Sequence, residues 1–432
     1  MTESFSTRLN DAMALRELKQ IDFVHAAEKF NIKLGKSHMS QYVSGKTVPR
    51  ADIAHFLAAY LRVNEDWLMG KDVPMEEHAA ILPDFAGEQP DHVDDASEQP
   101  TEGRTMRTFT KSHKLDNVLY DVRGPVADEA ARMEAAGTHI LKLNIGNPAP
   151  FGFRTPDEVV YDMSQQLPDT EGYSPSKGLF SARKAIMQYA QLKNIPNVSI
   201  DDIYTGNGVS ELINLSLSAL LDNGDEVLVP SPDYPLWTAC VNLAGGTAVH
   251  YVCDEDSEWY PDIDDMRSKI TDKTKAIVII NPNNPTGALY PKEVLQQIVD
   301  LAREHQLMIF SDEIYDRLVM DGLEHISIAS LAPDLFCVTF SGLSKSHMIA
   351  GWRVGWMVAP LEVAKAAAKL QGHMTSNVAN ISQRAALAAV AGPLDEVHEM
   401  RKDFDARRRA IVTALNDIEG VNCPTPTGAF YA

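Results

Sequence analysis

The 432-residue sequence contains little that would place it outside the cell or in a membrane. Its four cysteines lie far apart and form no Cys-x-x-Cys pair, so the patterns of a disulfide framework and of a zinc site are both missing. No apolar run approaches the roughly 18 residues that a membrane helix needs. The first residues lack the basic and apolar regions of a signal peptide. These absences favour a soluble cytoplasmic protein with no metal site and no membrane contact.

Charge is distributed unevenly along the chain, whose formal net charge is −21. Residues 1–71 carry ten basic and eight acidic side chains, whereas residues 72–105 carry ten acidic side chains and one basic one, with several prolines. Such an acidic stretch with few large apolar residues cannot bury enough surface to fold. We therefore expect a small domain over 1–71, a disordered acidic linker over 72–105 and a large domain over 106–432.

The first 71 residues show short helical patterns separated by turns. Apolar residues recur at helical spacing over 9–18, 23–30, 36–46, 53–60 and 66–69. A glycine-containing break before the third pattern is typical of a helix-turn-helix motif. Met39, Tyr42 and Val43 would face inward. The opposite face of the third helix would present side chains able to contact phosphates and base edges, namely Lys36, Ser37, Ser40 and Gln41.

This segment resembles the Cro/phage-repressor type of DNA-binding domain, including the Ser-Gly-Lys-x-x-Pro sequence that ends its third helix. The resemblance implies DNA binding, commonly as a pair of such modules. A small helical bundle used for dimerisation or protein contact also fits these residues. The net charge of +2 over 1–71 keeps this alternative open, because non-specific DNA affinity depends on phosphate neutralisation.

From about residue 110 short β-rich runs alternate with amphipathic helices. Strands are expected at 226–229, 276–280, 307–310, 335–340 and 354–358, with helices over 211–221 and 292–305. Alternation of strand and helix predicts a three-layer α/β fold, in which a mainly parallel sheet is covered by helices on both faces. In such sheets ligands bind beyond the carboxyl ends of the strands.

Polar residues follow four of these strands where each one ends. The residues, in chain order, are Tyr234, Asn281 and Asn284, Asp312, and Lys345. Because the carboxyl ends of parallel strands share one edge of a sheet, their side chains should lie close together. Singly, each has an ordinary explanation as a turn residue, a helix cap or a solvated lysine. Their joint occurrence at four strand ends indicates a functional site.

The lysine, and an arginine eight residues after it, suggest the ligand. Lys345 lies among small residues, where an amine can lose its proton and attack an aldehyde. Arg353 offers a forked and permanently charged group for a phosphate. An aldehyde that also carries a phosphate describes pyridoxal phosphate.

Three further motifs meet the needs of that cofactor. Asp312 can pair with a protonated pyridine nitrogen and make the ring an electron sink. Tyr315 could reach the phenolic oxygen, and the Asn-Pro-x-Asn-Pro turn could aim the Asn284 amide at the same atom. The glycine-containing sequence 206–210 opens a helical run, so its backbone N–H groups would form a phosphate cradle.

Residues from about 107 to the end resemble the class I aminotransferases, which are fold-type I pyridoxal-phosphate enzymes, and in particular the bacterial glutamate–pyruvate (alanine) aminotransferases. Besides the asparagine, aspartate and lysine motifs, the resemblance is carried by the sequences at 115–125, 143–152, 206–212 and 233–237. It implies the fold-type I architecture, pyridoxal 5'-phosphate as cofactor, and a homodimer with shared active sites.

The resemblance also implies roles for individual residues. Lys345 would form the Schiff base and carry the proton, with Asp312 on the ring nitrogen and Tyr234 against the ring face. The other cofactor contacts would be Gly208, Val209, Ser210, Asn284, Tyr315, Ser344 and Arg353, with Tyr173 reaching the partner subunit's phosphate. The substrate contacts would be Gly146, Tyr120, Arg123 and Asn284.

The expected function is a ping-pong exchange of an amino group between alanine/pyruvate and glutamate/2-oxoglutarate, fused to a DNA-binding module. One alternative is a transcription regulator whose aminotransferase-like domain senses the cofactor or an amino acid. Another is an aspartate or aromatic aminotransferase, or a β-lyase, on the same fold. The family continues beyond the position of Ala432 and supplies there an arginine for the substrate carboxylate, so we expect a C-terminally truncated sequence.

Overall fold

The computed structural model describes residues 4–16, 18–29, 32–61, 63–71, 73, 75, 112–115, 118 and 125–432. The chain forms two compact units, Met1–Met106 and Arg107–Ala432. Most of the expected acidic linker, together with Tyr120 and Arg123, lies outside the described residues. Among the described residues, no helix is long and apolar enough to cross a membrane, and no cluster of three metal-ligating side chains occurs.

The described part of the N-terminal unit is helical. Its elements are α1 (Phe5–Leu15), α2 (Gln20–Lys29), α3 (Lys36–Val43), α4 (Ala51–Leu61) and α5 (Glu65–Leu68). Ser4 caps α1 by accepting a hydrogen bond from the N–H of Thr7, and Asn64 caps α5 in the same way through Asp66 and Trp67. The helices are held together by apolar residues such as Leu9 and Leu57, which have no exposed surface.

The two faces of α3 differ in burial. Met39 and Tyr42 are buried, and Val43 packs against the same core. On the other face Lys36, Ser37 and Ser40 are exposed and Gln41 is half-buried. This helix therefore presents a polar face while its apolar face anchors it to the unit.

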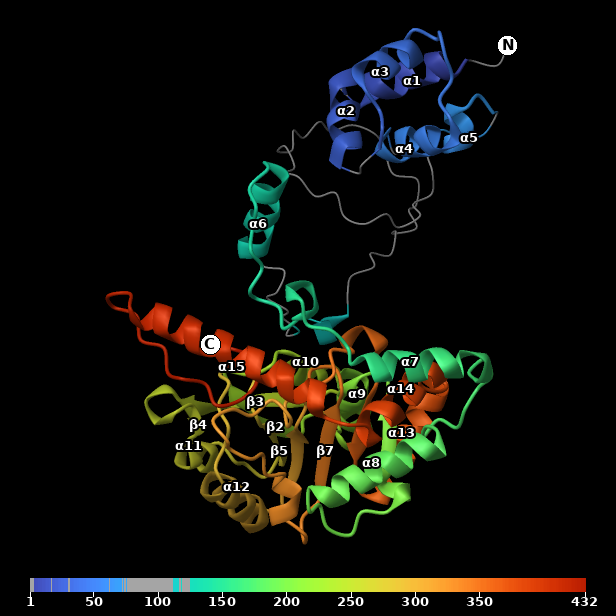
Figure 1. The fold of residues 1–432 in the computed structure, drawn as a ribbon. Helices are drawn as coiled ribbons and strands as arrows, with labels where there is room; N and C mark the ends of the chain where they lie inside the picture. The colour runs from blue at the N-terminus through green and yellow to red at the C-terminus, as the bar shows by residue number, and fades with distance from the viewer. Residues whose placement is uncertain are drawn as a thin grey trace. The chain divides into compact units, whose positions relative to one another are not determined.

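Within residues 125–432 an eight-stranded mixed sheet forms the middle of three layers (Figure 1). The strands run in the order β1-β8-β7-β6-β5-β2-β3-β4. Their bounds are β1 Ile203–Gly206, β2 Glu226–Ser231, β3 Thr247–Asp254, β4 Tyr260–Pro261, β5 Thr274–Ile280, β6 Met308–Asp312, β7 Cys337–Gly342 and β8 Gly355–Val358. The central strands read as continuous apolar runs because helices cover both of their faces.

Alternate residues of each central strand enter different cores. Val278 and Ile280 of β5 pack with α9 (Val209–Leu220), α10 (Leu236–Leu243) and α13 (Leu361–Met374). Ile277 and Ile279 pack on the opposite face with α11 (Ile263–Ser268) and α12 (Lys292–His305). The remaining α-helices of this unit are α6 Pro125–Ala135, α7 Asp157–Gln166, α8 Phe180–Leu192, α14 Asn380–Ala391 and α15 Asp395–Asn416.

The sheet is less parallel than the sequence suggested. Strands β2, β3, β5, β6 and β7 form parallel pairs, but β8 pairs antiparallel with both β7 and β1. The chain between Gly342 and Gly355 contains no α-helix that could cross back over the sheet, so β8 returns beside β7 in the opposite direction. This turn-back places residues 343–354 at the carboxyl edge of the parallel strands.

Candidate active site

A cavity of about 510 Å³ lies at that edge of the sheet. Ten of the residues singled out in the sequence line it: Gly146, Val209, Ser210, Tyr234, Asn284, Asp312, Tyr315, Ser344, Lys345 and Arg353. Gly208 adjoins the cavity, because a Cβ built on it would lie 2.3 Å from an Arg353 guanidinium nitrogen. Tyr173 is 93% exposed and does not line the cavity. The fold thus brings most of the predicted residues into one space.

Lys345 enters the cavity from the loop between β7 and β8. Its Nζ donates a hydrogen bond to the backbone oxygen of Gly146, at 2.8 Å. Burial lowers the pKa of this amine and Arg353 acts in the same direction, while Asp312 opposes the change. A larger fraction of the amine is therefore unprotonated than in a solvated lysine, as a nucleophile or a base requires.

Asp312 ends β6 and is almost fully buried. Its Oδ2 accepts a hydrogen bond from Trp237 Nε1 and its Oδ1 accepts one from the backbone N–H of Ile314, both at 3.3 Å. Burial raises the pKa of this carboxyl to about 6, although both hydrogen bonds and Lys345 favour the charged form. A buried carboxylate of this kind is suited to pair with a cation that enters the cavity.

The start of α9 and Arg353 form a second polar corner of the cavity. Gly208 is the N-cap of α9 and has a φ of 82°, which places the N–H groups of Val209 and Ser210 at the helix start. The Arg353 guanidinium donates to the backbone oxygens of Asn207, at 3.1 Å, and Ala350, at 3.0 Å. A helix N-terminus beside a guanidinium is a site for a phosphate.

Residues 426–431 cross two loops that carry cavity residues. The N–H groups of Thr427 and Gly428 donate to the oxygen of Gly287, which follows the Asn284 turn, at 3.1 and 2.8 Å. Ala429 N–H donates to the oxygen of Leu318, beyond Tyr315, at 2.8 Å. The hydroxyls of Tyr315 and Tyr431 share a hydrogen bond. This crossing segment connects both sides of the cavity.

Two functional contacts were not foreseen from the sequence. Trp237 supplies a hydrogen bond to Asp312, and Tyr431 lines the cavity and bonds Tyr315. Trp237 lies three residues after Tyr234 at the start of α10, and this helical spacing was the available signal. Tyr431 is separated from Tyr315 by 116 residues, so no local pattern could indicate their contact.

Comparison with known proteins identifies the family of the chain. Residues 138–432 match the model of the family described as aminotransferase class I and II. The glutamate-pyruvate aminotransferase AlaA of Escherichia coli (strain K12) is 53% identical over 334 residues, which cover 76% of this chain and 82% of that protein. An alanine aminotransferase of Mycobacterium bovis is 51% identical over 335 residues, covering 76% of this chain and 78% of that protein.

Solved structures show the same fold at similar coverage. The crystal structure of an aminotransferase from Escherichia coli superposes with a TM-score of 0.72 at 52% identity, over 75% of this chain and 82% of the other. Alanine aminotransferase from Pyrococcus furiosus gives a TM-score of 0.71 at 40% identity, over 74% and 82%. With this fold and this cavity, the chain belongs to the class I and II aminotransferases and is a fold-type I enzyme.

Proposed function

We propose that the chain transfers amino groups between alanine/pyruvate and glutamate/2-oxoglutarate in a ping-pong reaction. The observation that carries the proposal is an amine of lowered pKa, Lys345, in one cavity with the buried carboxylate of Asp312 and the guanidinium of Arg353. The substrate assignment is supported by relatives at 51–53% identity, whose names specify glutamate–pyruvate or alanine aminotransferase.

The family implies pyridoxal phosphate, and the residues of the cavity fit this group. A Cβ at Gly208 would lie 2.3 Å from the Arg353 guanidinium, so this corner is a narrow cradle that only glycine leaves open. Arg353, Ser344, Val209 and Ser210 would hold the phosphate by charge and by hydrogen bonds to the helix start. These groups supply the positive potential that a dianion requires.

The other end of the cavity suits the ring of the cofactor. Asp312 would pair with the ring nitrogen, and its low solvent exposure would strengthen that ion pair. Asn284 and Tyr315 would donate to the phenolic oxygen, and Tyr234 would pack against the ring face. Gly146 would line the substrate site, and its lack of a side chain lets the Tyr431 hydroxyl come close, because a Cβ there would lie 2.6 Å from that oxygen.

The chain's own groups then perform the acid–base chemistry. When bound, pyridoxal phosphate supplies an aldehyde for an amine and a ring that withdraws electrons from the substrate carbon. Lys345 Nζ would take up the proton that the α-carbon of the amino donor loses and give it up again within the same half-reaction, and the second half-reaction would run these transfers in reverse. Tyr120 and Arg123 would close over a small amino acid.

A homodimer is typical of the family, and we propose that two copies share their cavities. Tyr173 is 93% exposed in the single chain, and Phe180 and Leu192 are 64% and 81% exposed. Burial of these side chains against a second copy would remove apolar surface from water, which favours association. Within a dimer Tyr173 would reach the phosphate of the partner subunit's cofactor.

We further propose that residues 1–71 bind DNA as a helix-turn-helix domain. The support is the division of α3 into a buried side, with Met39, and an exposed polar side, with Lys36 and Ser37. Ser40 and Gln41 extend the same polar side toward the end of the helix. Such a face could meet phosphates and base edges without loss of the apolar core.

Replacement of the cavity lysine tests the catalytic assignment. Lys345→Ala should reduce turnover of alanine plus 2-oxoglutarate by at least about a thousandfold, because the amine acts both as nucleophile and as base. Borohydride should fix the cofactor to Lys345 in the unmodified chain and to nothing in the variant, as read by peptide mass spectrometry. Lys365→Ala, on the exposed side of α13, is the control. Retained transamination in Lys345→Ala would refute the assignment. Repeated release of keto acid and ammonia, without an acceptor, from an amino acid with a leaving group on its β-carbon would favour a β-lyase.

The phosphate cradle can be tested by adding one methyl group. Gly208→Ala should displace the Arg353 guanidinium and weaken pyridoxal phosphate binding by about tenfold to a hundredfold, since a charge-assisted hydrogen bond contributes roughly 1.5–3 kcal/mol. The control is Gly224→Ala, because Gly224 has a similar φ of 93° and a Cβ there meets no atom within 4 Å. Equilibrium dialysis measures both affinities. Equal weakening in the two variants would mean that backbone strain, and not the cradle, is responsible.

Ionisation of the buried Asp312 carboxyl should make the cofactor-free chain less stable as the pH rises. The folded pKa of Asp312 is about 6, above the ordinary value of 3.8, so the folded state holds an extra proton between these values and loses stability through this window. In urea titrations at pH 7, the free energy of unfolding of Asp312→Asn should therefore exceed that of the unmodified chain by about 3 kcal/mol. At pH 4 the two free energies should be equal. Asp417→Asn, at an exposed site, should show neither effect. A pH-independent difference for Asp312→Asn would contradict this account.

DNA binding should depend on α3 and on salt. In a mobility-shift titration with a pool of random-sequence duplexes, affinity should fall steeply as salt rises. Lys36→Ala should weaken binding more than Arg16→Ala, which removes the same charge just beyond α1. Absence of a shift even at low salt would leave a role in dimerisation or protein contact for residues 1–71.

A further inference from the structure

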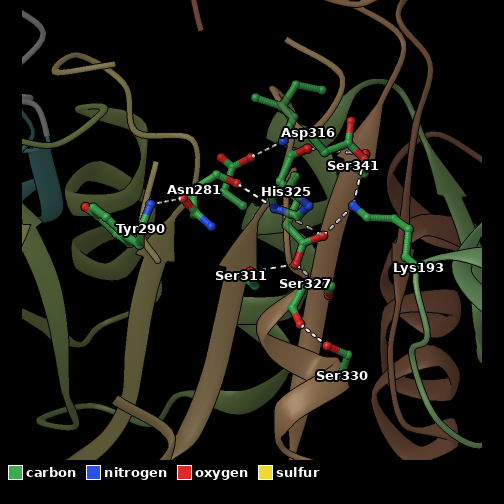
Figure 2. Close-up of polar contacts among 12 residues, drawn as sticks. Lys193, Asn281, Tyr290, Ser311, Asp316, His325, Ser327, Ser330 and Ser341 are labelled. Carbon is green, nitrogen blue, oxygen red and sulfur yellow. Dashed lines mark hydrogen bonds and ion pairs between the residues drawn. The ribbon is translucent and has the colours of Figure 1, made fainter. Parts of the chain in front are cut away.

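A buried cluster of charged side chains, centred on Lys193, lies next to Asp312 in the chain (Figure 2). Glu313 follows Asp312 in the chain and has no exposed surface. Its Oε1 accepts hydrogen bonds from Ser327 Oγ, at 2.7 Å, and Ser311 Oγ, at 3.0 Å. Its Oε2 lies 2.7 Å from Lys193 Nζ. A carboxylate buried to this degree requires such partners, because desolvation strongly disfavours its charge.

Lys193 connects this carboxylate to a second one. It is the C-cap residue of α8, and its Nζ also lies 2.7 Å from Asp316 Oδ2. The hydroxyl of Tyr189 donates to the same oxygen at 2.6 Å. The Arg317 guanidinium lies 4.5 Å from the centre of the Tyr189 ring. One ammonium thus holds two buried carboxylates on either side of a turn only four residues long, from 313 to 316.

The cluster is bonded to the strand ends that carry cavity residues. The Glu313 N–H donates to Phe340 O of β7 at 2.8 Å, and the Asn281 N–H after β5 donates to Asp312 O at 3.0 Å. His325 Nε2 lies 3.1 Å from the backbone oxygen of Asn281 and 3.9 Å from Glu313 Oε2. These contacts fix the backbone of Asp312 from both neighbouring strands.

A second path leads to the lysine loop. Arg317 Nη1 lies 3.5 Å from His347 Nε2, and His347 Nδ1 lies 2.9 Å from Ser346 Oγ. A guanidinium is only a donor, so His347 accepts through Nε2 in its contact with Arg317. Ser346 follows Lys345 directly. The cluster therefore includes or contacts Glu313 and Ser346, the sequence neighbours of Asp312 and Lys345, and it acts on these two side chains through the backbone.

We propose that Lys193 is a positioning residue, which holds the 313–316 turn through Glu313 and Asp316 and thereby keeps the Asp312 carboxylate in the cavity. The inference rests on the proposed function, because it assigns Lys193 to the affinity for pyridoxal phosphate. Buried ion pairs are often replaceable without loss of stability, so stability alone does not explain this arrangement. Glu313, which Lys193 holds, is the residue next to Asp312, so a shift of this ion pair would move the Asp312 carboxylate as well. A displacement near 1 Å at such a site can reduce activity about a hundredfold.

The test compares cofactor affinity in the full chain and three variants. Lys193→Met removes the charge but keeps most of the side-chain volume, Lys193→Arg keeps the charge, and Lys269→Met breaks a remote pair with Asp265 at 2.7 Å. Equilibrium dialysis with pyridoxal phosphate should show binding about tenfold to a hundredfold weaker in Lys193→Met. Binding in Lys193→Arg should lie within about threefold of the unmodified chain, and Lys269→Met should match it. In the cofactor-free chain, hydrogen exchange at the Asn281 amide should be faster in Lys193→Met.

The outcomes separate the positioning role of Lys193 from the proposed function. Unchanged affinity and unchanged exchange at Asn281 in a folded Lys193→Met chain would overturn the positioning role while leaving the proposed function intact. If the unmodified chain itself bound no pyridoxal phosphate, the proposed function would fail and this inference with it. If Lys193→Met did not fold, Glu313→Gln would decide, because its amide oxygen can still accept from Ser311 and Ser327 while the ion pair is lost. Undiminished cofactor affinity in Glu313→Gln would then refute the proposal.

Discussion

The site depends on the Asp312 carboxylate, which the fold buries without a cationic ligand beside it. Within the part of the chain that the structure describes, the Asp312 carboxylate accepts two hydrogen bonds at 3.3 Å, from Trp237 and from the backbone of Ile314. Neutral donors soften the desolvation of a carboxylate but do not replace an opposite charge. Burial of this charge therefore costs the folded chain stability at the site where the cofactor would bind. Local conflict of this kind is expected at functional sites and is tolerated because the surrounding core is well packed.

The antiparallel return of β8 gives the site its shape. A parallel crossover after β7 would carry the chain over a face of the sheet and away from the strand ends. Instead, residues 343–354 stay at the edge, so that Lys345 and Arg353 come from one loop. Lys345 meets Gly146 at one end of the cavity, and Arg353 meets the start of α9 at the other. One loop therefore sets the distance between the amine and the anion-binding corner.

Strongly patterned parts of the chain could be predicted well. The helix expected at 292–305 has those bounds, and the expected central strands differ from β2, β5, β6 and β7 by at most two residues at either end. The short strands β1 and β4 were missed because runs of four and two residues carry too little periodicity. Strand β3, next to the short edge strand β4, was also missed, since its half-exposed residues give no continuous apolar run. Strand direction and the contact between Tyr315 and Tyr431 depend on long-range packing, which local sequence does not encode.

The crossing segment at 426–431 joins two loops that border the cavity. It is hydrogen-bonded to Gly287 on one side and to Leu318 on the other, and its Tyr431 lies beside Gly146. Backbone hydrogen bonds from this one segment tie the position of the Asn284 turn to that of the loop beyond Tyr315. Neither loop can shift far without straining bonds to the other, so the width of the cavity between them is set by a stretch of chain more than a hundred residues away in the sequence.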